Sequence, residues 1–220
     1  MSGEPIVKRL GLVEYEPTWR AMRDFTAARA SDTPDEIWLL QHPPVFTLGM
    51  AGKREHLLAD KASPSGIPVV ETDRGGQVTY HGPGQIVIYL LLDLRQHGYG
   101  IKELVRRMEQ AIIDVLAAYG IAAQRQTGAP GVYVDRAKIA ALGLRVKNGC
   151  TYHGLSLNVD MDLTPFLAIN PCGYAGMAVT QLKDLVAQSA YRTVEESLLS
   201  NLLRQLTSAA RSVSRSSAQD

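Results

Sequence analysis

The chain has 220 residues, of which 45% are hydrophobic and 20% charged, and its formal net charge is +1. This composition is typical of a globular protein with a substantial core, and the near-neutral charge argues against bulk electrostatic binding to nucleic acid. Two cysteines cannot form a secreted disulfide framework, and no CxxC or HxxxH spacing indicates a metal site.

The sequence shows no targeting or membrane signal. Its N-terminal residues have neither a basic start nor an apolar stretch of signal-peptide length. The longest apolar run, over 86–92, is about a third of a membrane span. We therefore expect a cytoplasmic protein with reduced thiols and no membrane partner.

Taken in chain order, the apolar pattern predicts a first helix over 17–30. A central helix over 101–119 follows, with Gly120 as its C-terminal stop. The last helix, over 193–210, begins with a capping box formed by Thr193 and Glu196. Strand-like runs lie between these helices, over 37–40, 45–48, 67–72, 86–92, 131–134, 137–147 and 151–159.

Several of these runs are joined by turns too short to contain a crossover helix, which favours antiparallel pairing. The predicted fold class is α+β, with a mixed, largely antiparallel sheet flanked by helices. Neither an internal repeat nor an interior linker divides the chain. We expect residues 1–210 to form a single domain and the serine-rich residues 211–220 to be a disordered tail.

One of the two cysteines, Cys172, lies between a proline and a glycine, in the run Asn170-Pro171-Cys172-Gly173-Tyr174-Ala175-Gly176. These flanks predict a turn that presents the thiol, because neither suits the interior of a helix or a strand. Cys150 opens the strand over 151–159 without turn flanks, so a structural role is the preferred interpretation there. A presented thiol that reacts needs a partner that makes it a thiolate.

The strand over 137–147 offers a candidate for that partner. Alternation places Lys138 on the apolar face, whereas Arg145 and Lys147 point to the other face. One interpretation is a strand-end lysine whose ammonium reaches water along its apolar stem. The alternative is a partly desolvated lysine with a lowered pKa, able to accept a proton from a nearby thiol.

Two other segments carry polar groups that a ligand could use. His153 shares a predicted face with Leu155 and Leu157, where a satisfied core histidine is the default interpretation. The glycine-rich segment 74–85 predicts either a pair of tight turns around a short strand or a loop whose backbone approaches a ligand. Its spacing fits neither a P-loop nor a dinucleotide fingerprint.

These segments, in this order and spacing, resemble the octanoyl-(acyl-carrier-protein):protein octanoyltransferases of lipoate biosynthesis. The resemblance covers about residues 5–205 and includes a further block at 42–49. It implies that Cys172 forms an acyl-thioester intermediate and that Lys138 lowers the pKa of that cysteine. It also implies that the acyl chain is bound by Arg74, Gly75, Gly76, Gln77, Val78, Thr79, Tyr80, His81, Ala141, Leu142, Gly143, Gly154, Leu155 and Ser156.

The resemblance further implies a fold like that of biotin and lipoate protein ligases, and no cofactor. The implied donor is octanoyl-acyl carrier protein. The implied acceptors are the lipoyl domains of 2-oxoacid dehydrogenase complexes and the glycine cleavage H protein. Two alternatives stay open: an ATP-dependent lipoate or biotin ligase on the same fold, which would not need Cys172, and a non-catalytic carrier-protein-binding domain, which would form no covalent adduct.

Overall fold

The computed structural model describes residues 4–58, 66–170 and 177–208. Cys172 and the serine-rich tail over 211–220 lie outside the described residues. Among those that are described, the main sheet has the strand order β1-β2-β6-β10-β9-β8-β7. Its strands are β1 (Ile6–Leu12), β2 (Glu36–Gln41), β6 (Gln85–Leu91), β7 (Gln124–Gln126), β8 (Ala129–Val134), β9 (Ala137–Lys147) and β10 (Cys150–Asn158).

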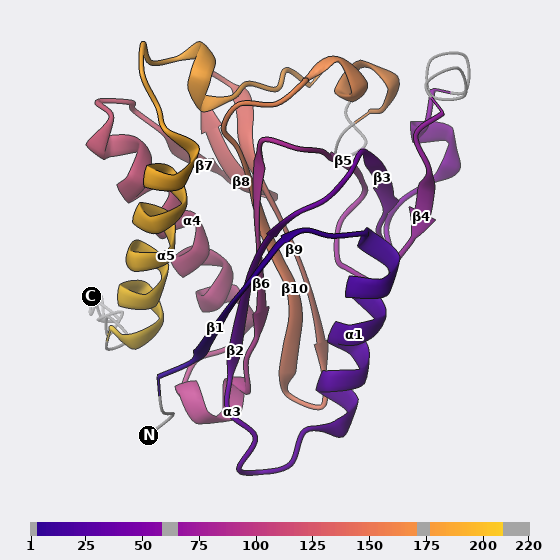
Figure 1. The fold of residues 1–220 in the computed structure, drawn as a ribbon, viewed down its shortest axis with the longest axis vertical. Coiled ribbons are helices and arrows are strands. Elements are labelled where there is room, and N and C mark those ends of the chain that lie inside the picture. The colour runs from indigo at the N-terminus through magenta and orange to yellow at the C-terminus, as the bar shows by residue number, and fades with distance from the viewer. Residues whose placement is uncertain (1–3, 59–65, 171–176, 209–220) are drawn as a thin grey trace, which may run out of the picture.

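Pairing in this sheet is antiparallel except between β1 and β2, which are parallel. The predicted class, a mixed and largely antiparallel sheet flanked by helices, is therefore confirmed. A smaller sheet has the order β4-β3-β5, with β3 (Val45–Leu48), β4 (Val69–Glu71) and β5 (Val78–His81). It lies beside the upper end of the main sheet in Figure 1.

Helices cover both faces of the main sheet (Figure 1). Helices α4 (Ile101–Ala118) and α5 (Tyr191–Thr207) bury their apolar stripes against one face, where Met108 and Leu202 are fully buried. Helix α1 (Tyr15–Ala28) packs on the opposite face through Met22, against Trp38 and Tyr89. Because the central strands are covered on both sides, every residue of β10 is buried.

The predicted helices are present, but the capping box is wrong. Helix α5 begins at Tyr191, so Thr193 lies inside its first turn, and no side chain caps its N-terminus at Ala190. Tertiary packing explains the earlier start: Tyr191 packs on the core and its hydroxyl donates to the carbonyl of Gln85, while Val194 is fully buried. At the end of α4, Gly120 has φ +74°, as a C-terminal glycine stop requires.

The structure contains several elements that the sequence does not predict. They are β1, β7, the four-residue helix α3 (Leu94–His97), and the 3₁₀ turns at Arg54–His56, Thr164–Ala168 and Leu182–Asp184. Strands β1 and β7 occupy the two edges of the sheet and are largely exposed. Without a buried face they lack the apolar alternation on which strand prediction depends.

Candidate active site

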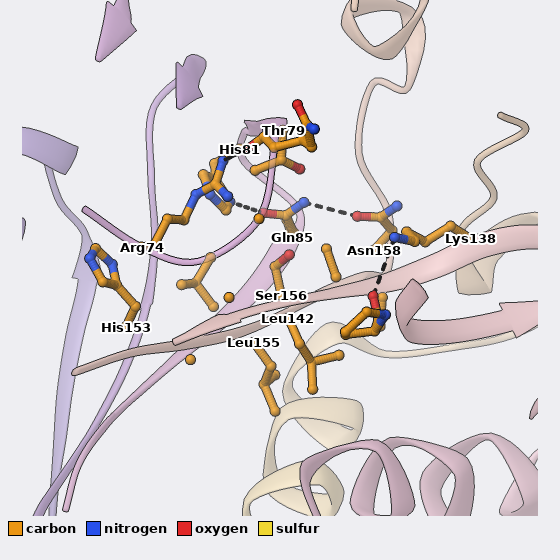
Figure 2. Close-up of a pocket in the computed structure, with 18 of the residues that line it drawn as sticks. Arg74, Thr79, His81, Gln85, Lys138, Leu142, His153, Leu155, Ser156 and Asn158 are labelled. Carbon is orange, nitrogen blue, oxygen red and sulfur yellow. Dashed lines mark hydrogen bonds between the residues drawn. The ribbon is translucent and has the colours of Figure 1, made fainter. Parts of the chain in front are cut away.

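A pocket opens between the central strands β9 and β10 and the loop that precedes β5. Figure 2 shows Arg74, His81, Lys138 and His153 arranged around it. The lining of the pocket is mainly apolar, as is common for sites that bind small molecules. All the predicted acyl-binding residues line it except Gly75 and Tyr80.

The two exceptions have structural contacts. The amide of Gly75 donates to the carbonyl of Leu144 at 3.0 Å, which fastens the loop to β9. Tyr80 packs its ring against Phe46 and Phe166, with centroids 5.6 and 5.4 Å away, in the core of the small sheet. Their positions beside the lining residues explain why a contiguous motif includes them.

The side chain of Arg74 holds the loop that precedes β5 in place through hydrogen bonds. Its Nη2 donates to the carbonyl of Thr47 at 2.7 Å and to that of Gln77 at 2.6 Å, and its Nε donates to the Thr47 hydroxyl at 3.0 Å. The side chain is buried. A guanidinium with a fork of fixed donors can hold several carbonyls at once, so Arg74 fixes the turn that forms one wall of the pocket.

Lys138 lies near the start of β9 and lines the pocket. Lys138 is only 4% exposed, so the interpretation as a strand-end lysine that reaches bulk water is wrong. The Nζ atom donates to the carbonyl of Pro130 at 3.4 Å and lies 5.1 Å from the ring centroid of Tyr133. Lys138 lines the pocket together with Ala140 and Leu142, but the predicted alternation does not hold at the start of β9. A register shift in the pairing of β8 with β9 falls between Lys138 and Ala140, and the Lys138 side chain lies beside Gly131, the strand partner of Ala141.

The backbone of Lys138 pairs with the chain that follows Cys172. The amide of Lys138 donates to the carbonyl of Ala178 at 2.8 Å, and the amide of Thr180 donates to the carbonyl of Lys138 at 3.0 Å. Ala178 is six residues beyond Cys172 in the sequence. The chain over 178–180 is thus joined to the strand that carries the predicted base.

Cys150 is buried, as the structural interpretation requires, and it is a free thiol. Burial, with a smaller contribution from the charge of Asp93, raises the pKa of its thiol. Because the thiolate is the nucleophile, this environment disfavours reaction at Cys150.

His153 is buried as predicted, but it also lines the pocket. Its Nε2 is 3.1 Å from a carboxylate oxygen of Asp73, and its Nδ1 has no hydrogen-bond partner among the described residues. Burial lowers the pKa of this imidazole and outweighs the opposite effect of Asp73. The backbone at His153 has φ +61°, a left-handed conformation that histidine adopts more readily than most residues.

Two further histidines, His42 and His81, lie near Arg74, with their ring centroids 5.9 Å apart. His42 binds the carbonyl of Val13 through Nδ1 at 2.6 Å and the hydroxyl of Tyr89 through Nε2 at 2.7 Å. Burial lowers its pKa to about 4. Burial, together with the charge of His42, lowers the pKa of His81 to about 3. Both rings are therefore neutral at neutral pH, and His81, which lines the pocket, brings no imidazolium charge to it.

The sequence-based prediction missed several polar residues that line the pocket. Gln85 and Asn158 hydrogen-bond to each other at 2.9 Å, and Tyr15 stacks on His81 with ring centroids 5.9 Å apart. Single polar residues at the ends of apolar strands are usually read as solvent-facing. The sequence offers one indication of these polar residues: Gln85 is the last residue of the glycine-rich segment 74–85.

Among the described ranges, no cluster of three or more histidine, cysteine, aspartate or glutamate side chains has a metal-binding arrangement. Over the same ranges, every helix is too short or too polar to traverse a bilayer.

Comparison with known proteins assigns the fold and the family. The lipoyl protein ligase A/B catalytic domain family matches residues 14–203. An octanoyltransferase of Thiobacillus denitrificans is 64% identical over 203 residues, which cover 92% of this chain and 91% of that protein. An octanoyltransferase of Dechloromonas aromatica is 63% identical over 202 residues, covering 92% of this chain and 97% of that protein.

Solved structures show the same architecture at low identity. Lipoate-protein ligase A bound with ATP superposes with a TM-score of 0.74 at 16% identity, over 93% of this chain and 86% of that one. Biotin protein ligase from Aquifex aeolicus gives a TM-score of 0.57 at 10% identity, over 91% and 70% of the two chains.

The sheet, its helices and the pocket between β9 and β10 define a catalytic domain of the lipoyl protein ligase A/B type. The identity to octanoyltransferases extends over nearly the whole length of both proteins. The chain belongs to the octanoyltransferase family, and it is an enzyme, a transferase. The resemblance noted from its motifs is confirmed.

Proposed function

We propose that this enzyme transfers an octanoyl group from octanoyl-acyl carrier protein to the ε-amine of a lysine on a lipoyl domain, through a thioester on Cys172. The observation that carries the proposal is the position of Lys138. It is buried at the pocket and is hydrogen-bonded through its backbone to the segment that follows Cys172. The names of the relatives support the octanoyl group.

In the first half-reaction, the neutral amine of Lys138 takes the proton of the Cys172 thiol. The thiolate attacks the thioester carbonyl, the bond from that carbon to the carrier sulfur breaks, and the carrier thiolate leaves with the proton from Lys138. A free thiol with a pKa near 8.5 is only a few per cent thiolate at neutral pH. Each unit by which that pKa falls requires about 1.4 kcal/mol of preferential interaction with the thiolate.

In the second half-reaction, the unprotonated ε-amine of the acceptor lysine attacks octanoyl-Cys172. The carbon–sulfur bond breaks, an amide forms, and the proton lost by the amine reaches the Cys172 sulfur by way of Lys138. Exchange of one thioester for another is nearly balanced, and forming an amide from a thioester is downhill. The cycle therefore needs no nucleotide.

The pocket suits the acyl chain of this donor. Its lining is mainly apolar, and residues such as Leu142 and Leu155 give an eight-carbon chain surface to bury. The proposed acceptors are the lipoyl domains of 2-oxoacid dehydrogenase complexes and the glycine cleavage H protein, in the cytoplasm.

The test is incubation with octanoyl-acyl carrier protein without ATP, followed by intact-mass spectrometry. We expect the addition of one octanoyl group that hydroxylamine removes, and no addition to Cys172→Ala. An adduct that persists in Cys172→Ala, or acylation that appears only with ATP and free octanoate, would contradict the proposal. The second result would identify a ligase.

The role of Lys138 is tested separately by Lys138→Met, with Lys147→Met as the matched control at the exposed end of the same strand. Loss of a general base typically slows a reaction about 10²–10⁴-fold. We expect Lys138→Met to form the adduct that much more slowly and Lys147→Met to match the wild type. Equal rates for the two variants would remove the lysine from the mechanism and leave Cys172 in it.

A further inference from the structure

A continuous line of side-chain hydrogen bonds crosses the wall of the pocket (Figure 2). The Nδ1 atom of His81 is 2.7 Å from Oε1 of Gln85, and Nε2 of Gln85 donates to Oδ1 of Asn158 at 2.9 Å. The Nδ2 atom of Asn158 then donates to the backbone carbonyl of Thr180 at 3.0 Å. We call these four residues the amide relay.

The direction of every bond in the amide relay follows from its last member. A backbone carbonyl only accepts, so Asn158 must present its NH₂ group to Thr180 and its oxygen to Gln85. Gln85 must then donate to Asn158 and offer its own oxygen to His81. His81 therefore carries its proton on Nδ1 and is fixed in one tautomer.

The amide relay is buried where a broken bond is costly. The exposed fraction is 1% for Gln85, 4% for Asn158 and 6% for His81. All three residues line the pocket, and they come from β6, β10 and β5. An unpaired polar group at this depth costs free energy, so the four groups hold one arrangement.

The relay ends on the chain that pairs with Lys138. Thr180 accepts from Asn158 through its carbonyl, and its amide donates to the carbonyl of Lys138 at 3.0 Å. The residue before it, Val179, forms a parallel bridge with Lys138 and lines the pocket. Asn158 thus fastens this short segment to β10, while Lys138 fastens it to β9.

We propose that Asn158 and Gln85 are positioning residues for acyl transfer: through Thr180 they fix the segment that follows Cys172 against the strand of Lys138. The proposal rests on the proposed function, because it assigns them the task of aligning that thiol and that amine. Neither residue exchanges a proton with the substrate. A small error in the relative placement of two reacting groups is enough to lower a rate about a hundredfold.

The first test replaces the polar groups and keeps their approximate size, in Asn158→Leu and Gln85→Met. The matched control is Gln181→Met. Gln181 is also buried, beside Thr180, but it binds the amide of Met161 and the carboxylate of Asp184 and does not line the pocket. The measurements are the rate of octanoyl adduct formation at saturating donor, the donor concentration at half-saturation, and the melting temperature.

We expect each relay variant to form the adduct about tenfold to a hundredfold more slowly, with half-saturation changed less than about twofold. We expect Gln181→Met to lose a similar amount of thermal stability and to keep the wild-type rate. Wild-type rates in both relay variants would overturn the proposal, as would an equal loss in Gln181→Met. If the wild type itself forms no adduct, the proposed function fails instead.

The second test uses Asn158→Asp, which keeps the shape. A protonated carboxyl both donates and accepts, so it can replace both bonds of Asn158, whereas a carboxylate cannot donate to Thr180. The rate of this variant relative to the wild type should therefore rise as the pH falls. Dividing by the wild-type rate removes the pH dependence of the thiol. A ratio that stays constant or falls toward low pH would contradict the amide relay.

Discussion

A carboxylate oxygen of the partly exposed Asp73 lies 3.1 Å from Nε2 of His153, a buried histidine that lines the pocket. Asp73 also accepts a hydrogen bond from the indole of Trp19 at 2.8 Å and one from the hydroxyl of Tyr152. Since Asp73 directly precedes Arg74, these bonds join the loop over the pocket to α1 and β10.

Asp73→Asn should therefore destabilise the fold in a pH-dependent way. Burial alone would raise the pKa of this carboxyl, but the hydrogen bonds from His153, Tyr152 and Trp19 together hold it well below its usual range. A lowered pKa contributes stability that is complete above the unfolded value, about 3.9, and is lost as the pH falls through the folded value.

We expect the variant to lose about 1–3 kcal/mol of unfolding free energy at pH 7, and the difference from wild type to shrink below about pH 4. Urea denaturation of wild type and variant, at pH 7 and at a pH below about 4, measures this difference in unfolding free energy. Asp24→Asn, an exposed change on α1, is the control. A difference that is the same at both pH values would show that the charge of Asp73 is unimportant.

Gly154→Ala should damage the sheet rather than the chemistry. A Cβ on Gly154 would lie 2.0 Å from the backbone carbonyl oxygen of Ile88 on the neighbouring strand, which cannot move aside as a flexible side chain could. Overpacking of this kind typically costs about 1–3 kcal/mol. Gly100→Ala, where a Cβ meets nothing within 4 Å, should cost about 1 kcal/mol or less. Equal losses in thermal denaturation would disprove the steric explanation.

The sequence predicted the elements whose signals are local. The apolar stripes of α1 and α4, the β-branched run of β6 and the alternating leucines of β10 are patterns within one segment. The same kind of pattern singles out Lys138, as one cation on the predicted apolar face of a strand. Burial of both faces of the central strands then excluded the solvent-reaching interpretation.

Features that depend on pairing between distant segments were not predictable. Nothing near Asn158 in the sequence indicates that its partners are Gln85 and Thr180, because strand register and the path of the chain after Cys172 bring them together. The false capping box at Thr193 has the same origin, since packing of Tyr191 sets the start of α5. Local preference gives way where tertiary contacts decide.

Cys150 should be unreactive in the folded protein. It is buried, and burial raises the pKa of its thiol, so little thiolate is present at neutral pH. We expect iodoacetamide to modify Cys150 only slowly in the native protein and rapidly in urea, measured by mass spectrometry of its peptide. Rapid native modification of Cys150 would mean that this thiol, rather than Cys172 alone, must be considered as a nucleophile.

Ala141→Leu should change the preferred length of the acyl chain. Ala141 lines the pocket at the centre of β9, opposite Ser156 on β10 and Gly131 on β8. A leucine there would occupy space that the end of an octanoyl chain needs, while a hexanoyl chain, shorter by two methylenes, would lose less contact. Each buried methylene is worth about 0.8 kcal/mol, so the preference should shift by about tenfold toward hexanoyl.

The measurement is the ratio of kcat/KM for hexanoyl- and octanoyl-acyl carrier protein in wild type and variant. Ala117→Leu, on the exposed side of α4, controls for the added side chain itself and should leave the ratio unchanged. If Ala141→Leu lowers kcat/KM equally for both donors, the acyl chain does not extend past Ala141. The apolar lining of β9 would then be core packing, and the chain would have to follow the pocket along another wall.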